Sequence, residues 1–146
     1  MRAQDLMTHD VFTANPAETI QTVAKRMADL DVGVLPVAEN ERLVGMITDR
    51  DIVVRGVAEG KGPAALVRGV MTPEIKYCFA DQEIDEIAAN MADIQVRRLP
   101  VVNREKQLVG ILSLCDIATS EDVDLANEAL CGISRPAASA IPYQAI

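Results

Sequence analysis

The chain has 146 residues, of which 49% are hydrophobic, and its formal charge is −8. A chain of this length is expected to form one integrated domain rather than two independent ones. No apolar run reaches the roughly 18 to 20 residues that cross a membrane, and the N-terminus lacks a signal-peptide core, so we expect a cytoplasmic protein without membrane contact. The acidic charge repels phosphate backbones and argues against a nucleic-acid partner.

The cysteines and the histidine offer little chemistry. Cys78, Cys115 and Cys131 do not have the spacing of a metal or redox motif, and an odd number favours reduced thiols in a cytosol. A bridge between Cys78 and Cys131 stays open as an alternative. His9 is the only histidine, so neither a histidine-based triad nor a multi-histidine metal site can be assembled, and we expect no metal site.

The first part of the chain predicts a helix, a hairpin and a second helix. The i, i+3, i+4, i+7 spacing of an amphipathic helix is met by Ile20, Val23, Ala24 and Met27. Thr19 is the predicted N-cap of this helix. Residues 34–38 (VLPVA) and 43–48 (LVGMIT) flank a polar turn and predict a hairpin that is buried on at least one face. The second helix begins near Asp49.

The same pattern returns later in the chain. Short motifs match after a shift of 64 residues, or of 65 residues after one extra residue in the polar turn. The matching pairs are Met7-Thr8 with Met71-Thr72, Leu35-Pro36-Val37 with Leu99-Pro100-Val101, and Gly45 to Asp51 with Gly110 to Asp116. This internal duplication predicts the order strand, helix, strand, strand, helix twice.

We therefore expect an α+β fold of two β-α-β-β-α repeats that pack sheet to sheet about a pseudo-twofold axis. Residues 1–62 are the first repeat with its connector, and residues 63–120 are the second repeat. Residues 121–146 are expected to form a C-terminal helix followed by an extended tail. One side of that helix would carry Leu125, Ala126, Ala129 and Leu130.

The repeated motifs resemble those of a tandem pair of cystathionine-β-synthase-type (CBS) domains, also called a Bateman module. The resemblance covers about Asp5 to Ala118 and depends on three motifs that occur in both copies. They are Met-Thr before the first strand, Leu-Pro-Val in a strand, and Gly-apolar-x-Thr/Ser-x-x-Asp where a strand meets a helix. The resemblance implies a stand-alone regulatory module, not an enzyme, with a ligand cleft between its repeats.

The implied ligand is an adenosine-type nucleotide, namely AMP, ADP, ATP, NAD or S-adenosylmethionine. No cofactor is required. The resemblance also implies a homodimer that transmits ligand occupancy. Because the chain contains no output domain, the effector would be a separate protein of unknown identity.

The strand-end motif supplies the candidate site. Thr48 precedes a helix, where unpaired N–H groups and the positive end of the helix dipole favour a phosphate. Asp51, one turn later, can accept charge-assisted hydrogen bonds from both hydroxyls of a ribose. The adenine is expected between apolar walls that include Val11, Thr13 and Pro36.

A competing interpretation needs no ligand. A hydroxyl followed three residues later by a carboxylate also forms a capping box at the start of a helix. The Thr48/Asp51 pair and the equivalent Ser113/Asp116 pair in the second repeat both fit this pattern. The residues alone leave ligand binding and capping open, because duplication of a fold also duplicates its caps.

Two neighbouring arginines precede the second Leu-Pro-Val motif. The resemblance implies that Arg97 or Arg98 crosses the pseudo-twofold axis and meets the phosphate of the cleft at Thr48 and Asp51. Strand alternation allows only one of the two to point into that cleft. The competing interpretation is an arginine pair on a solvated strand edge.

The two repeats differ at the positions that carry this charge. The first repeat has Gly33 and Val34 in place of the arginine pair, and Arg50 of the first repeat is replaced by Cys115 in the second. We therefore predict that the Thr48/Asp51 cleft binds a phosphorylated adenosine ligand. The cleft of the second repeat is predicted to be weaker or empty.

Two further functions are weighed against nucleotide sensing. A ligand-free structural dimerisation module is the alternative, in which the hydroxyl–carboxylate pairs only cap helices. An enzyme acting on nucleotides has the least support, because the cleft offers aspartates and hydroxyls but no activated nucleophile. Apolar faces at residues 52–54 and 117–118 suit a helix-rich dimer interface.

Overall fold

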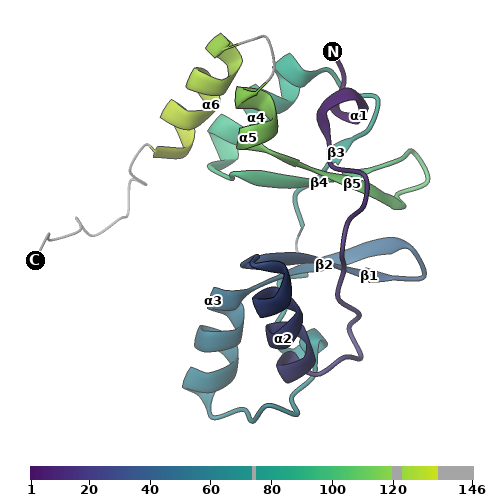
Figure 1. Cartoon of the computed structure of the whole chain (residues 1–146), viewed down its shortest axis with the longest axis vertical. Coiled ribbons are helices and arrows are strands. Elements are labelled where there is room, and N and C mark those ends of the chain that lie inside the picture. The colour runs from purple at the N-terminus through teal and green to yellow at the C-terminus, as the bar shows by residue number, and fades with distance from the viewer. Residues whose placement is uncertain (74, 120–122, 135–146) are drawn as a thin grey trace, which may run out of the picture.

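The computed structural model describes residues 1–73, 75–119 and 123–134. Two halves lie one above the other, and each turns a small sheet toward its neighbour and carries helices on the outer side (Figure 1). The predicted α+β fold of two packed repeats is confirmed. No helix within these ranges is long and apolar enough to cross a membrane.

The first half contains the predicted helices and hairpin. Its elements are α2 (Ile20–Leu30), β1 (Val34–Glu39), β2 (Arg42–Thr48), α3 (Asp49–Asp51), the π-helix η1 (Ile52–Gly56) and the 3-10 helices η2 (Val57–Glu59) and η3 (Val67–Gly69). The Thr19 hydroxyl accepts a hydrogen bond from the Thr22 N–H, as expected of an N-cap. The expected first strand is reduced to one parallel bridge between Ala14 and Val37.

The second half repeats this order with a better-formed first strand. Its elements are β3 (Cys78–Phe79), α4 (Ile84–Ile94), β4 (Arg98–Val102), β5 (Leu108–Ser113), α5 (Leu114–Ala118) and α6 (Val123–Ser134). Here β3 pairs in parallel with β4, and β4 pairs antiparallel with β5. The expected tail, residues 135–146, lies outside the described residues.

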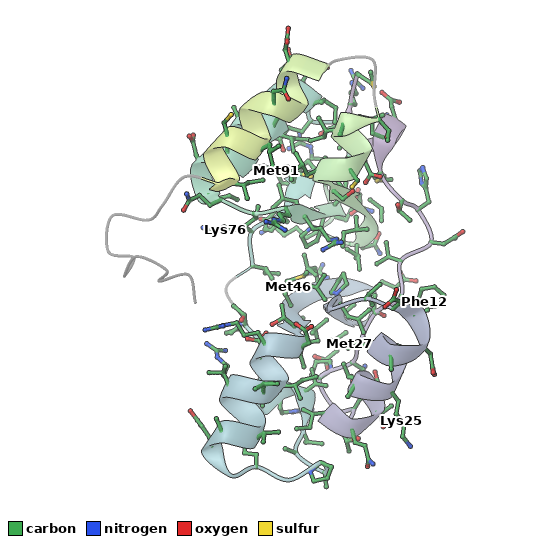
Figure 2. All side chains as sticks on the ribbon, turned by 60° about the vertical axis from the view of Figure 1, so that its left-hand side comes forward. Phe12, Lys25, Met27, Met46, Lys76 and Met91 are labelled. Carbon is green, nitrogen blue, oxygen red and sulfur yellow. The ribbon has the colours of Figure 1, made fainter. Side chains whose placement is uncertain are left out.

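Side chains alternate along each hairpin and give it two different faces. Leu35, Val37 and Ile47 are at most 3% exposed and form the core of the first half with α2. Met27, predicted on the apolar side of its helix, is 6% exposed, and the equivalent Met91 of the second repeat is 0% exposed, so these side chains lie inside the two halves (Figure 2). The other face of each hairpin is turned toward the opposite half.

The two halves exchange their leading segments. The segment before the first repeat packs on the second half, and the segment before the second repeat packs on the first half. The N-terminal helix α1 (Ala3–Leu6) lies beside the second half, and the Thr8 N–H and C=O pair with Ile111 at 2.9 and 3.0 Å. In the same way, the N–H and C=O of Thr72 pair with Met46 at 2.8 and 3.0 Å. The division at residue 62 follows the sequence repeat, whereas in space the halves exchange these segments (Figure 1).

Glycines permit the close approach of the exchanged segments. A Cβ on Gly45 would lie 2.9 Å from the Thr72 carbonyl oxygen and 3.0 Å from the Met71 sulfur. A Cβ on Gly110 would lie 2.9 Å from the Thr8 carbonyl oxygen and would also overlap the Met7 sulfur. The glycine of each strand-end motif and the Met-Thr motif are therefore two sides of one contact.

The C-terminal helix α6 packs on α4 and α5 of the same chain. A Cβ on Gly132 would lie 2.6 Å from the Ala92 Cα, so the absence of a side chain lets the two helices touch. Gln95 donates a hydrogen bond to the Gly132 carbonyl at 3.0 Å. All three cysteines are free, so the alternative of a Cys78–Cys131 bridge is wrong.

Replacement of Gly110 by alanine tests the contact between the exchanged segments. We expect Gly110→Ala to lower the free energy of unfolding by about 1 to 3 kcal/mol, because the new methyl group meets backbone that cannot move without loss of the Thr8–Ile111 pairing. Urea unfolding measures this change. The matched control is Gly62→Ala, where a Cβ meets nothing within 4 Å. An equal and small effect of the two substitutions would contradict the proposed role of Gly110.

Candidate functional site

Both strand ends form complete capping boxes. Thr48 Oγ1 accepts from the Asp51 N–H at 3.0 Å, and Asp51 Oδ2 accepts from the Thr48 N–H at 3.0 Å. Ser113 and Asp116 repeat this arrangement at 3.1 and 2.8 Å. The capping interpretation is confirmed. It does not exclude a ligand, because a carboxylate has about four acceptor positions and the box occupies one of them.

The helix start in the first repeat differs from the expected phosphate site. The Asp49 N–H donates to the Gly33 carbonyl at 2.9 Å, and the Arg50 N–H donates to Asp49 Oδ1 at 2.8 Å. Together with the capped Asp51 N–H, these bonds use the first-turn donors of α3. The expectation that unpaired N–H groups at this helix start would hold a phosphate is therefore wrong, and a phosphate would need side-chain cations.

An apolar cavity of about 320 Å³ lies between the two halves. The first half contributes Val11 and Pro36, two of the predicted adenine walls, and the second half contributes Arg98. The remaining lining residues are Thr8, Asp10, Phe12, Leu30, Val32, Val34, Leu35 and Ile111. Its size is at the lower end of the roughly 300 to 1,000 Å³ that is usual for small-molecule sites.

Arg98, rather than Arg97, belongs to this cavity. Arg98 is paired across the sheet with Ser113, while Val34 on the opposite wall is paired with Thr48. Arg98 is thus next to the strand end of its own repeat and shares the cavity with Val34 of the other repeat. Both arginines are exposed, but Arg97 does not line the cavity, and its carbonyl accepts from the Leu114 N–H at 2.8 Å.

A second, more polar cavity of about 460 Å³ adjoins the first across Val11, which lines both. Thr13, the third predicted wall residue, lies here and not in the apolar cavity. The other lining residues are His9, Ala38, Glu41, Gln107, Leu108 and Val109. The predicted walls are therefore divided between two neighbouring cavities.

The remaining predicted site residues do not line either cavity. They are Thr48, Arg50, Asp51, Arg97, Ser113 and Asp116. Thr48, Asp51, Ser113 and Asp116 are half-buried at the strand ends, whereas Arg50 is exposed. The structure thus brings Val11, Pro36 and Arg98 together and leaves the hydroxyl–carboxylate pairs outside the lining of both cavities.

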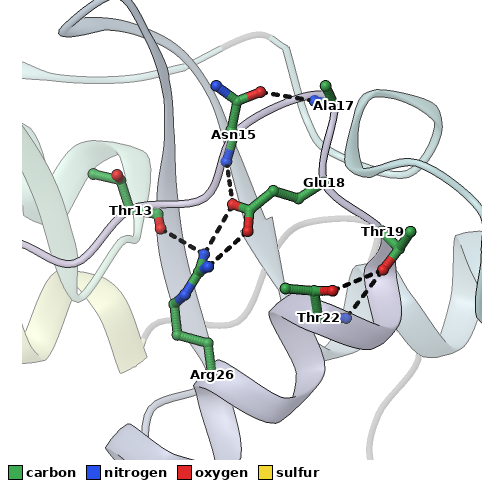
Figure 3. A network of polar contacts seen from close by, with 7 residues as sticks. All are labelled: Thr13, Asn15, Ala17, Glu18, Thr19, Thr22 and Arg26. Carbon is green, nitrogen blue, oxygen red and sulfur yellow. Dashed lines mark hydrogen bonds and ion pairs between the residues drawn. The ribbon is translucent and has the colours of Figure 1, made fainter.

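A polar network that the sequence did not suggest joins the Thr13 segment to helix α2 (Figure 3). Arg26 on α2 donates to the Thr13 carbonyl at 2.8 Å and forms a two-point ion pair with Glu18 at 2.9 and 2.6 Å. The side-chain hydrogen bond to Arg26 holds the pKa of Glu18 below its ordinary value and raises the pKa of Arg26. The one available signal was that Arg26 is matched by Asn90 in the second repeat.

Two further observations concern a buried thiol and possible metal ligands. Burial raises the pKa of the Cys78 thiol to about 12, so this side chain stays protonated. Within the described ranges, no group of three or more His, Cys, Asp or Glu side chains is placed to hold a metal ion.

A family model described as CBS domain matches residues 3–56 and 67–121. The chain belongs to the CBS domain family. It contains two CBS domains in tandem, as the strand-end and Met-Thr motifs predicted.

The relatives extend over most of the chain. The CBS domain-containing protein YhcV of Bacillus subtilis is 39% identical over 133 residues, which cover 90% of this chain and 94% of YhcV. Hypoxic response protein 1 of Mycobacterium tuberculosis is 40% identical over 118 residues, which cover 80% of this chain and 82% of that protein.

Solved CBS structures have the same architecture. The structure of hypoxic response protein I with two coordinated zinc ions has a TM-score of 0.74 and 38% identity, covering 81% of this chain and 97% of that one. The CBS domain pair of protein MJ0100, in complex with 5′-methylthioadenosine and S-adenosylmethionine, has a TM-score of 0.70 and 26% identity, covering 81% and 93%.

Proposed function

We propose that this CBS pair is a regulatory module that binds an adenosine-type nucleotide in the cleft between its repeats. The observation that carries the proposal is the apolar cavity between the halves, which combines Val11 and Pro36 with the cation of Arg98. An aromatic base needs apolar walls, and a phosphate or carboxylate needs a positive charge. The CBS pair of MJ0100 binds two adenosine compounds, which supports this class of ligand.

The carboxylates at the strand ends would bind the ribose without giving up their caps. Asp51 and Asp116 each use Oδ2 in the capping box, and Oδ1 has no hydrogen bond to another described residue. The cap fixes the side chain before the ligand arrives, so less conformational entropy is lost on binding. The same carboxylate would then cap the helix with Oδ2 and bind the ribose with Oδ1.

The alternative is a ligand-free structural module. It is favoured by the capping boxes, which satisfy the strand ends without any ligand. In that case the inter-repeat cavity would be a packing defect between two duplicated sheets. The two functions differ in whether the folded chain is stabilised by an adenosine compound.

A thermal-shift series with AMP, ATP, NAD and S-adenosylmethionine distinguishes the two functions. At a ligand concentration about 100 times the dissociation constant, mass action should raise the melting temperature by on the order of 5 to 10 °C. Inosine monophosphate is the control, since its purine lacks the amino group of adenine. No shift with any adenosine compound would leave the structural module as the better account.

We propose further that the two strand ends bind unequally, with the cleft at Asp51 the tighter. Arg98 lies across the apolar cavity from Val34, the cross-strand partner of Thr48, whereas the first repeat has Gly33 and Val34 at the equivalent positions and offers no arginine to the cleft at Asp116. The Asp49 carboxylate beside Gly33 lowers the affinity of the same cleft for a phosphorylated ligand, because its negative charge repels a phosphate. The second repeat has the uncharged Leu114 at this position.

Titration calorimetry of Asp51→Asn and Asp116→Asn measures this inequality. Asparagine keeps an acceptor for the cap but loses the charge, so the change reports on the ribose contact. We expect Asp51→Asn to weaken binding by about tenfold and Asp116→Asn to have little effect. Equal losses would remove the inequality, and a larger loss at Asp116 would mean that the Asp49 carboxylate outweighs Arg98.

The proposed homodimer would form through the first half. Val53, Val54 and Val57 are 59%, 45% and 65% exposed on η1 and η2, which makes an apolar face. The face expected in the second half differs, because Ile117 is fully buried and α6 covers α5. Nucleotide occupancy would reach an effector through the relative position of the two chains.

Light scattering at micromolar concentration tests the dimer. We expect a dimer for the natural chain and a monomer for Val54→Asp, because a buried unpaired carboxylate opposes association. Ala118→Asp places the same charge on the second half and should leave the dimer intact. A monomeric natural chain, or dissociation by Ala118→Asp alone, would contradict the proposed face.

A further inference from the structure

Val11 and Phe12 form part of the first-half wall of the apolar cavity, and this wall segment has few bonds to the β1–β2 sheet. Residues 11–13 lead into Ala14, whose N–H donates to the Pro36 carbonyl at 2.9 Å and whose C=O accepts from Ala38 at 2.9 Å. These two bonds form the only bridge of this segment to β1 within the described residues. Phe12 is 60% exposed, so burial does not hold the segment either.

Arg26 and Glu18 supply the missing attachment. The Arg26 guanidinium bonds the Thr13 carbonyl at 2.8 Å with the same nitrogen that meets Glu18 Oε1 at 2.9 Å. Glu18 Oε1 also accepts from the Asn15 N–H at 2.8 Å. One ion pair therefore ties both ends of the turn between the wall and α2, as Figure 3 shows. The side chains are only 29% and 25% exposed, which limits screening of the pair by solvent.

The second half solves the same problem differently. Gln82 replaces Glu18 and keeps the equivalent bond, accepting from the Phe79 N–H at 3.2 Å. Asn90 replaces Arg26, so no cation stands at this position. The Arg104 guanidinium instead lies 4.2 Å from the centre of the Phe79 ring and pairs with Asp81. The segment there is a true strand, since Cys78 and Phe79 both pair with β4. Sheet pairing holds the wall in the second half, and an ion pair holds it in the first.

The network is close enough to affect the cavity. Phe12 and Leu30 line the apolar cavity on one side and a hollow beside Arg26 on the other. A shift of the Thr13 carbonyl moves the neighbouring residue Phe12 and, through the chain, Val11. Loss of the ion pair would therefore loosen the wall without removing any residue that lines the apolar cavity.

We infer that Arg26 and Glu18 are positioning residues that preorganise the first-half wall of the nucleotide cavity. This inference rests on the proposed function for its effect on affinity, but the order of the wall can be measured without a ligand. A wall that is already ordered costs less entropy when a base packs against it. The pair thus orders a first-half segment whose sheet pairing is limited to the single bridge at Ala14.

The chain supplies the sharpest variant for the test. Glu18→Gln with Arg26→Asn gives the first half the residues of the second, Gln82 and Asn90, and keeps the acceptor for the Asn15 N–H. The matched control is Arg104→Asn with Asp81→Asn. It removes another two-point ion pair, at 3.0 and 2.7 Å, from an exposed site in the second half.

Hydrogen exchange of the Ala14 amide is the first measurement. We expect exchange to become roughly tenfold faster in the Glu18→Gln/Arg26→Asn variant, while the core amides of Val23 and Ile47 change little. The control variant should leave Ala14 unchanged. Equal exchange in the variant and the natural chain, or an equal acceleration of all three amides, would overturn the inference. If the double variant does not fold, Glu18→Gln alone is measured in the same way.

Affinity for the adenosine compound that gives the largest thermal shift is the second measurement. We expect the variant to bind roughly threefold to tenfold more weakly and the control to bind as the natural chain does. Unchanged affinity with a loosened wall would overturn the inference while the proposed function stands. If the natural chain binds no adenosine compound, the proposed function fails, and hydrogen exchange alone decides whether the pair orders the wall.

Discussion

The contact between a Met-Thr segment and a strand glycine is the constraint on which the rest of the structure depends. The backbone of Thr8 forms two hydrogen bonds with that of Ile111, next to Gly110. The backbone of Thr72 does the same with Met46, next to Gly45. Each contact fastens the start of one repeat to the hairpin of the other. It brings the chain at residues 8–12 across the gap between the sheets, where it becomes a wall of the cavity. The two sheets face one another because these crossings hold them there.

The candidate site shows how one arrangement can serve stability and binding together. The capping boxes at Asp51 and Asp116 are complete, so they stabilise the helix starts whether or not a ligand is present. A capped carboxylate is also a fixed acceptor, which the proposed ribose contact would use. The charges around the caps are less symmetrical than the caps themselves. At the first strand end the Asp49 carboxylate lies in the space that Gly33 leaves free. At the second strand end, Arg97 replaces Gly33 and Leu114 replaces Asp49.

Sequence reasoning predicted the features that periodicity and duplication determine. The core helices with Met27 and Met91, the two hairpins and the capping boxes are all present, because each depends on residues close together in the chain. The exchange of segments was not predicted. It depends on which of the two hairpins each Met-Thr motif pairs with. Both hairpins carry the same motif, so the sequence pattern does not distinguish between them.

The site was predicted only in part for a related reason. Val11, Pro36 and Arg98 meet in one cavity, but Thr13 lines the neighbouring cavity, which it shares with Val11. The donors at the start of α3 were expected to be free, yet the Gly33 carbonyl and the Asp49 side chain occupy two of them. Such bonds join residues 1 to 16 positions apart through local geometry that no residue pattern specifies.

The exchanged segments carry a consequence for the origin of the fold. Val67 and Val70 lie in the core of the first half, and Ala3 and Met7 in that of the second, so a chain with one repeat would leave such a core incomplete. Two single-repeat chains could meet this need by trading their leading segments as a symmetric pair. When the two repeats are joined in one chain, their association becomes intramolecular. Each repeat then has an effective concentration of the other in the millimolar range. Once fused, the two copies no longer had to be identical, and substitutions such as asparagine for arginine at a single corresponding position could accumulate in one copy alone.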